Sequence, residues 1–361
     1  MIPYFIFLFL VVGLAGLVEY FSSNKLVCRF LYVMIFLVMT LFAGLRSENV
    51  GTDSVRYSVL FSSTHTLQAV FDNFSTKELE IGFSLLACVG STLSDNYAAF
   101  FLLCATLGSA FFCIGIRNSP TNCCIAFSAM IMGGFFTFGF NGMRQTIAIA
   151  ICFCSMGTNS SKSFFRIVLF VALAILFHKS AIIFLPLYFI CKLTRNDSLK
   201  NSLVILTIAL AFVLLMPVLI EYSGVFYERY TLYGEDQRES VGTFSTLCLC
   251  FMGVFFFCIR NKISISKEHY VVLLHLLIFA CAIAVGSLLC AQSGSGVRRL
   301  SLYFSVSVIF LWPIIYANIS DRMYKLLFLV FFFSIGLVYY YLTTLNFNGL
   351  NPYIINPCVI P

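Results

Sequence analysis

The stretch Leu176-Phe-His-Lys-Ser-Ala181 places a histidine and a lysine in the middle of an otherwise apolar run, residues 164–193. A single helix over this run would be about 45 Å long, whereas the hydrocarbon core of a membrane is roughly 30 Å thick. A charged side chain at the centre of such a helix would cost several kcal/mol if it faced lipid. The sequence therefore predicts two short helices, 164–177 and 180–193, that meet at a polar break around His178 and Lys179.

The composition is that of a helical membrane protein. Of the 361 residues, 60% are hydrophobic and only 10% are charged, and the mean hydropathy is +0.97. Soluble domains average about 25% charged residues. Apolar stretches of spanning length recur from end to end, whereas a β-barrel would show short alternating segments. We therefore expect an all-α, polytopic integral membrane helix bundle that forms a single membrane domain over residues 1–361.

The fifteen cysteines lie mostly in apolar runs, with no CxxC pair and no histidine at metal-ligand spacing. They are expected to pack as small hydrophobic residues, and no metal is expected. The net charge of +7 does not indicate a nucleic-acid partner, because the basic residues follow the membrane topology.

The alternation of apolar segments and basic loops predicts about twelve crossings. The segments are 2–21, 27–45, 97–116, 122–140, 143–157, 164–177, 180–193, 201–220, 243–260, 270–291, 299–317 and 324–345. One set of connections then holds thirteen of the 22 basic residues and four of the 15 acids. The positive-inside rule assigns that set to the cytoplasm and both termini to the outside. A single span over 164–193 would invert every later loop, which again favours the break at His178.

Two long connections are predicted on the outer face. Residues 46–96 form an outer loop, and within it residues 81–93 are apolar but short for a span, so we expect a re-entrant or partly inserted helix there. Residues 221–242 form a second outer loop that is rich in tyrosine and acids. A turn at Gly139-Phe-Asn-Gly142 is expected to separate two further helices.

With this topology, basic side chains from distant parts of the chain fall at helix mouths on the outer face. They are Arg46, Arg144, Lys179, Arg298 and Arg299. Each one alone could be an interfacial anchor. Together they would suit a di-anionic group such as a pyrophosphate, because guanidinium groups bind phosphate oxygens in pairs.

The same stretches resemble the EpsG family, which is close to the Wzy-type polymerases of O-antigen and exopolysaccharide. The resemblance is carried, in chain order, by Arg46, Val50-Gly-Thr-Asp53, Tyr57, Glu80 with Gly82-Phe83, Met143-Arg-Gln-Thr-Ile-Ala148, Phe164-Phe165, Phe177-His-Lys-Ser-Ala181, Arg299 with Tyr303, and Asn351-Pro-Tyr353.

The resemblance implies a membrane glycosyltransferase of the GT-C-like class in the bacterial inner membrane. Its substrate would be an oligosaccharide repeat unit on undecaprenyl pyrophosphate, polymerised at the periplasmic face without a metal, a nucleotide sugar or any other cofactor. A chain-length regulator and a flippase in the same membrane would be its partners. The chemistry needs a base for the acceptor hydroxyl and fixed positive charge for the departing pyrophosphate.

We assign catalytic roles to three residues and substrate-binding roles to eight. The catalytic candidates are His178 or Asp53 as the base, and Arg144. The substrate-binding candidates are Arg46, Tyr57, Glu80, Gln145, Lys179, Arg298, Arg299 and Tyr303.

Two other classes of membrane protein share some of these features. A flippase or transporter of the same lipid-linked sugar would also need a basic cleft, but such folds often carry internal repeats, and the halves of this chain show no comparable self-similarity. A membrane O-acyltransferase would also feature an intramembrane histidine, but its chemistry does not require the set of arginines.

Overall fold

The computed structural model describes residues 1–76, 79–119, 121–157, 164–226, 239–290, 297–346 and 349–357. Within these ranges the chain is helical, and its only extended pairing is an isolated antiparallel bridge between Arg46 and Ile355. The predicted all-α class is confirmed for this part of the chain. The chain divides into two compact units, Met1–Ile182 with Ile319–Pro361 (unit 1) and Ile183–Asn318 (unit 2).

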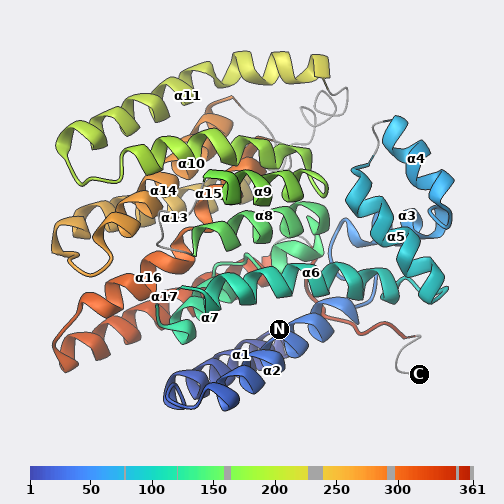
Figure 1. Ribbon diagram of the computed structural model, residues 1–361, viewed down its shortest axis with the longest axis horizontal. Helices are drawn as coiled ribbons and strands as arrows, with labels where there is room; N and C mark the ends of the chain where they lie inside the picture. The colour runs from blue at the N-terminus through green and yellow to red at the C-terminus, as the bar shows by residue number, and fades with distance from the viewer. Residues whose placement is uncertain are drawn as a thin grey trace. The chain divides into compact units, whose positions relative to one another are not determined.

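Unit 1 contains the helices of the first half of the chain and the last helix (Figure 1). Its elements are α1 (Ile2–Tyr20), α2 (Lys25–Gly44), α3 (Ser54–Ser63), α4 (Leu67–Ser75), α5 (Ile81–Leu93), α6 (Ala98–Arg117), α7 (Cys123–Met132), the 3-10 turn η1 (Thr137–Phe140), α8 (Met143–Met156), α9 (Phe164–Ile175) and α17 (Arg322–Asn346). Three helix N-termini are capped by side-chain oxygens, α2 by Asn24, α4 by Thr66 and α7 by Asn122.

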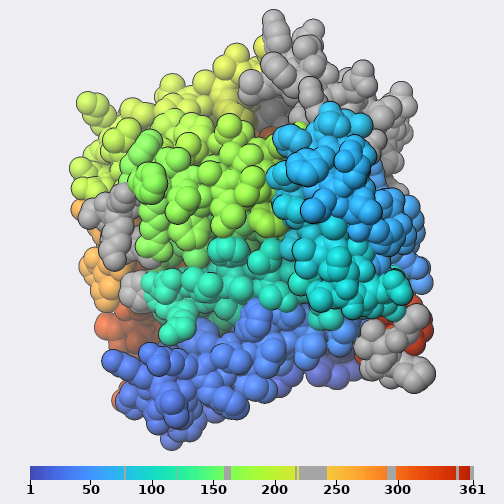
Figure 2. All heavy atoms as spheres, turned by 45° about the vertical axis from the view of Figure 1, so that its right-hand side comes forward, coloured from blue at the N-terminus to red at the C-terminus, as the bar shows by residue number. Residues whose placement is uncertain are grey.

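Helix α6 is central in unit 1, because it packs against α2, α8 and α5. Helix α1 packs on α2 and α7, and α9 packs on α8. The short helices α3 and α4 both pack on α5, beside the end of α6 (Figure 1). The space-filling view shows them adjoining α8 and α9 on one face (Figure 2).

Unit 2 is organised around one buried helix, α14 (Lys267–Leu289). The other elements are α10 (Phe184–Leu193), α11 (Leu199–Phe226), α13 (Glu239–Ile259), η4 (Arg260–Lys262), η5 (Val297–Ser301), α15 (Leu302–Ser305) and α16 (Val308–Asn318). Helix α14 packs against α10, α11, α13, α15 and α16. Its surface is apolar all round, as expected for a helix surrounded by others. Residues 227–238 of the second predicted outer loop lie outside the described residues.

Seven of the described helices are long and apolar enough to cross a membrane, namely α1, α2, α6, α13, α14, the run Arg298–Asn318 and α17. Five further apolar helices, α5, α7, α8, α9 and the first part of α11, have 10–17 residues. The chain is therefore a multi-pass membrane protein, and the count of twelve crossings stays a prediction. The predicted break near His178 is confirmed, because α9 ends at Ile175 and α10 begins at Phe184 after the short 3-10 turn η2 (Lys179–Ile183).

The C-terminal segment 349–357 is bonded to the start of the first outer loop. Backbone hydrogen bonds join Ser47 to Ile354, Asn356 to Leu45 and Gly51 to Gly349 at 2.8–2.9 Å. The Tyr353 ring stacks on Phe42 at 4.5 Å. The C-terminal segment thus holds the backbone that leads into α3.

Gly51 occupies a position that only glycine tolerates well. Its φ is +98°, in the left-handed region that L side chains rarely adopt. A Cβ here would also lie 2.8 Å from the carbonyl oxygen of Phe140 and 2.9 Å from Oδ1 of Asn141. Gly51 therefore allows the outer loop to approach the turn that precedes α8.

We expect Gly51→Ala to destabilise the protein by about 2 kcal/mol or more, because the left-handed conformation alone costs about 1–2 kcal/mol with a side chain. Thermal unfolding of the purified protein in detergent measures this loss. The matched control is Gly13→Ala in α1, where a Cβ would meet nothing within 4 Å. It should leave the unfolding temperature unchanged or slightly raised. Equal behaviour of the two variants would contradict the packing described for Gly51.

Candidate functional site

His178 lies where α9 is broken. The backbone N–H of His178 still donates to the Ala174 carbonyl at 2.9 Å, but the helix does not continue. The carbonyl of Leu176 instead accepts the N–H of Gly82, at the first turn of α5, at 2.8 Å. A Cβ on Gly82 would lie 2.7 Å from that carbonyl oxygen. The glycine therefore lets the start of α5 meet the break, and this contact brings Glu80 beside His178.

The carboxylate of Glu80 binds two basic side chains at once. Its Oε1 lies 2.9 Å from Nδ1 of His178, and its Oε2 accepts a hydrogen bond from Nη1 of Arg144 at 2.7 Å. The N–H of Lys179 also donates to Oε1 at 3.3 Å. The Glu80 side chain is 7% exposed, whereas those of Arg144 and His178 are both 23% exposed. We call Glu80, Arg144 and His178 the carboxylate cluster, and its two bases are the members that solvent reaches.

The electrostatics of the cluster keep Glu80 ionised. Burial alone would raise the pKa of the carboxyl group, but the hydrogen bond with His178 and the charge of Arg144 outweigh it and lower the pKa from 4.5 to about 2. A carboxylate with so low a pKa is a poor proton acceptor at neutral pH. The chemical role that fits Glu80 is therefore to orient its two partners.

The turn before α8 fixes Arg144, and the Gly-Thr-Asp stretch holds that turn. Oδ1 of Asn141 accepts hydrogen bonds from the Thr52 hydroxyl at 3.1 Å and the Asp53 N–H at 3.3 Å. The Tyr57 hydroxyl donates to the Asn141 carbonyl at 3.1 Å. These bonds anchor the backbone three residues before Arg144.

Arg144 has two further neighbours, one in α5 and one in α3. Its guanidinium lies 5.8 Å from the ring centre of Phe83 in α5, within the range of a cation–π contact. The Tyr57 hydroxyl is a second hydrogen-bond partner of the guanidinium beside Glu80. Arg144 is thus held by α3 and α5 while it projects from α8.

The structure places the predicted site residues of unit 1 at different depths. Glu80, Arg144 and His178 meet, and Tyr57 lies beside them. Asp53 is half-buried at the N-terminus of α3, and Gln145 is buried in the first turn of α8. Arg46 is 2% exposed and lies at the end of α2, between the rings of Phe101 and Phe140.

Arg298, Arg299 and Tyr303 belong to unit 2. Arg298 donates a hydrogen bond to the Ser245 hydroxyl of α13, and Tyr303 is fully buried in α15. The prediction that Arg298 and Arg299 join Arg144 at one pocket stays a prediction.

Two supporting residues were missing from the sequence-based set of site residues. Asn141 is 2% exposed and is the point where the outer loop is tied to α8. Phe83 is the aromatic neighbour of Arg144. The Gly139-Phe-Asn-Gly142 turn signal located Asn141, but a turn signal says nothing of the side chain's hydrogen bonds.

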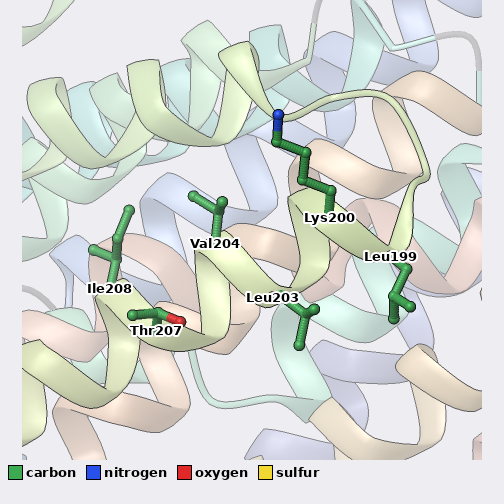
Figure 3. A pocket seen from close by; sticks show the side chains of 6 residues that line it. All are labelled: Leu199, Lys200, Leu203, Val204, Thr207 and Ile208. Carbon is green, nitrogen blue, oxygen red and sulfur yellow. The ribbon is translucent and has the colours of Figure 1, made fainter.

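A groove of about 550 Å³ lies on unit 2, along α11 (Figure 3). Its lining consists of Leu199, Lys200, Leu203, Val204, Thr207 and Ile208. These side chains are apolar except for one lysine and one threonine, so the groove offers no acid–base pair. The carboxylate cluster is the better candidate for a catalytic site.

Comparison with known families identifies the family of the chain. The model of the EpsG family matches residues 29–355, which is most of the chain and includes every residue of the carboxylate cluster. The chain belongs to the EpsG family. This is a Wzy-like family of polysaccharide polymerases, so the glycosyltransferase-like class predicted from the resemblance is supported. No curated protein and no solved structure matches the chain.

The lowered pKa of Glu80 predicts how the stability of this EpsG protein depends on pH. A carboxyl group with a depressed folded-state pKa stabilises the fold fully above its ordinary value of 4.5, and the contribution is lost as the pH falls toward 2. We expect Glu80→Gln to be less stable than the native chain at pH 7, by an amount of order 3 kcal/mol. The two unfolding temperatures should begin to converge as the pH falls below about 4.5 and should continue to do so toward pH 2.

Thermal unfolding in detergent across this pH range checks the prediction. Asp72→Asn is the matched control, because Asp72 is an exposed carboxylate on α4 with no ion pair among the described residues. That variant should differ little from the native chain at any pH. A gap between native and Glu80→Gln proteins that stays constant from pH 7 to 3 would show that the contacts of the Glu80 carboxylate with His178 and Arg144 do not stabilise the fold.

Proposed function

We propose that this EpsG-family protein polymerises oligosaccharide repeat units carried on undecaprenyl pyrophosphate, at the periplasmic face of the bacterial inner membrane. The growing chain is transferred from its lipid carrier to the non-reducing end of a new unit. A twelve-crossing, GT-C-like topology belongs to the same proposal, as do a flippase that supplies the units and a chain-length regulator. The observation that carries it is the single carboxylate that binds a histidine and an arginine together.

His178 is the residue we propose as the general base. Glu80 fixes the Nδ1 side of its ring, so the tautomer with hydrogen on Nδ1 presents the Nε2 lone pair to an acceptor hydroxyl. This is the arrangement in which a carboxylate orients a catalytic imidazole. Asp53 is the alternative base, and its backbone N–H donates a hydrogen bond to Asn141 that holds the loop. The geometry favours His178.

Arg144 is the residue we propose for the departing pyrophosphate. Nη1 of Arg144 donates a hydrogen bond to Glu80, and further N–H groups of the guanidinium remain for phosphate oxygens. Because the side chain is mostly buried and held by Phe83, it is preorganised to stabilise charge that develops on the leaving group. Gln145, Lys179, Arg298, Arg299 and Tyr303 keep their predicted substrate-side roles as parts of this proposal, and Tyr57 supports Arg144. Arg46, predicted for the same role, is buried and is not assigned to the substrate.

The transfer is a single displacement at the anomeric carbon of the donor. The acceptor hydroxyl gives its proton to Nε2 of His178 while its oxygen forms the new glycosidic bond. The bond between the anomeric carbon and the pyrophosphate oxygen breaks, and its electron pair leaves with undecaprenyl pyrophosphate. The charge of the freed diphosphate is balanced by Arg144 and by the imidazolium of His178.

We expect His178→Ala and Arg144→Ala to lower polymer formation at least about 100-fold, the usual scale for losing a general base or an oxyanion-stabilising group. The measurement is the length distribution of the glycan in a strain in which each variant replaces the native protein. Single repeat units on the lipid carrier should accumulate, and the ladder of longer chains should disappear.

Matched controls come from the same face of unit 1. His65→Ala and Arg56→Ala remove an exposed histidine and an exposed arginine on or beside α3. Both should keep the full ladder. Membrane fractions must contain all four variants at native amounts. Long chains in either cluster variant would refute the assignment of the site.

A further inference from the structure

A second polar feature lies deeper in unit 1, away from the carboxylate cluster. It is a cavity of about 30 Å³ between α2, α6, η1 and α8. Arg46, Cys104, Ser109 and Thr146 are among the residues that line it, and most of the others are aromatic or aliphatic. A cavity needs about 10–15 Å³ of accessible volume to hold a water molecule. The cavity is therefore the size of one water molecule or one small ion.

Arg46 brings an uncompensated positive charge to this cavity. Its terminal nitrogens donate to the Ala43 carbonyl and, at 3.4 Å, to the Ser54 hydroxyl. The guanidinium lies 4.5 Å from the ring centres of both Phe101 and Phe140. All of these partners are neutral, and no carboxylate of the described chain lies within 4 Å of it. Burial lowers the pKa of Arg46 only to about 10, so the group is charged at neutral pH.

Three hydrogen-bonding atoms on the lining residues have no protein partner in the described part of the chain. They are Nε of Arg46, Oγ of Ser109 and Oγ1 of Thr146. The side chains are only 1–7% exposed. A buried polar atom without a partner costs about 1–3 kcal/mol. Three such atoms on one small cavity indicate that something else satisfies them.

Several buried hydroxyls of the described chain lack a partner, and those of Ser109 and Thr146 belong to residues that line the same cavity as Arg46. In membrane helices a serine or threonine commonly donates to a carbonyl of the preceding turn. Thr106 of α6 does so to Leu102 at 2.7 Å, and Ser128 of α7 does so to Cys124 at 2.8 Å. Ser109 and Thr146 do not, so their O–H groups are available to donate into the cavity.

We propose that this cavity binds a chloride ion, held by Nε–H of Arg46 and the hydroxyls of Ser109 and Thr146. All three groups can donate to an anion. A neutral water could also bridge them, but it would leave the guanidinium charge without a counter-ion in a low-dielectric interior, which is costly. A monatomic anion satisfies the donors and compensates the charge together. This inference is independent of the polymerase reaction, because it concerns a buried site that no substrate sugar enters.

The bound ion would connect three helices, α2, α6 and α8, near the turn that holds Arg144. Arg46 lies two residues after the end of α2, Ser109 is in the middle of α6 and Thr146 is in the first turn of α8. Phe140, which stacks on Arg46, is followed directly by Asn141. Chloride is therefore expected to stabilise the same junction that anchors Arg144.

The test is thermal unfolding of the purified full-length protein in detergent, in sodium chloride and in sodium gluconate at equal ionic strength. We expect chloride to raise the unfolding temperature saturably, by about 3 °C at ten times its dissociation constant. Bromide should substitute for it. Each variant is compared with itself in the two salts, so that a general loss of stability does not enter the result.

Ser109→Ala and Thr146→Val should lose the chloride-dependent shift, whereas the matched controls Ser128→Ala and Thr106→Val should keep it. Thr146→Ser, which retains the hydroxyl, should restore it if Thr146→Val does not fold. Equal unfolding temperatures of the native protein in both salts would mean that water fills the cavity, and this would overturn the proposal. A shift that persists in both cavity variants would place the halide elsewhere and would overturn it as well.

Discussion

The arrangement of the candidate site depends on one buried carboxylate that is divided between two bases. One oxygen of Glu80 holds His178, in the break after α9, and the other holds Arg144, in the first turn of α8. Such a carboxylate cannot move toward one partner without losing the other. The positions of the α5 N-terminus, the break after α9 and the start of α8 are therefore mutually fixed. The side chains of His178 and Arg144 keep a constant separation because both are bound to the same carboxylate.

The segment from Ser47 to Asp53 supports this arrangement by holding the turn before α8. The C-terminal segment binds the backbone at Ser47 and Gly51, and the residues after Gly51 bind Asn141. A chain of contacts thus runs from the end of the protein, through the loop, to the residue three positions before Arg144. The Gly-Thr-Asp stretch contributes chiefly backbone shape and hydrogen bonds to the turn. This explains how residues so far apart in the sequence can all matter to one cluster.

The sequence predicted the elements of this site better than it predicted their contacts. The polar pair inside an apolar run located the break at His178, because helix length and the cost of buried charge both act locally. Glu80 was named, but its role as the partner of Arg144 and His178 depends on a close backbone approach at Gly82, which no local pattern reports. Arg46 was expected at a substrate-facing helix mouth, and the structure places it 2% exposed between two aromatic rings.

The charge balance of the cluster explains why a shared carboxylate suits the proposed transfer. With His178 neutral, Arg144 and Glu80 cancel, so the resting site does not trap every anion that reaches it. When the imidazole takes the acceptor proton, the cluster gains a net positive charge at the moment when the diphosphate leaves. Glu80 stabilises that imidazolium and, because its pKa is held at about 2, does not take the proton itself. The favourable electrostatic energy is then available mainly in the transition state, which is where an interaction must act to raise the rate.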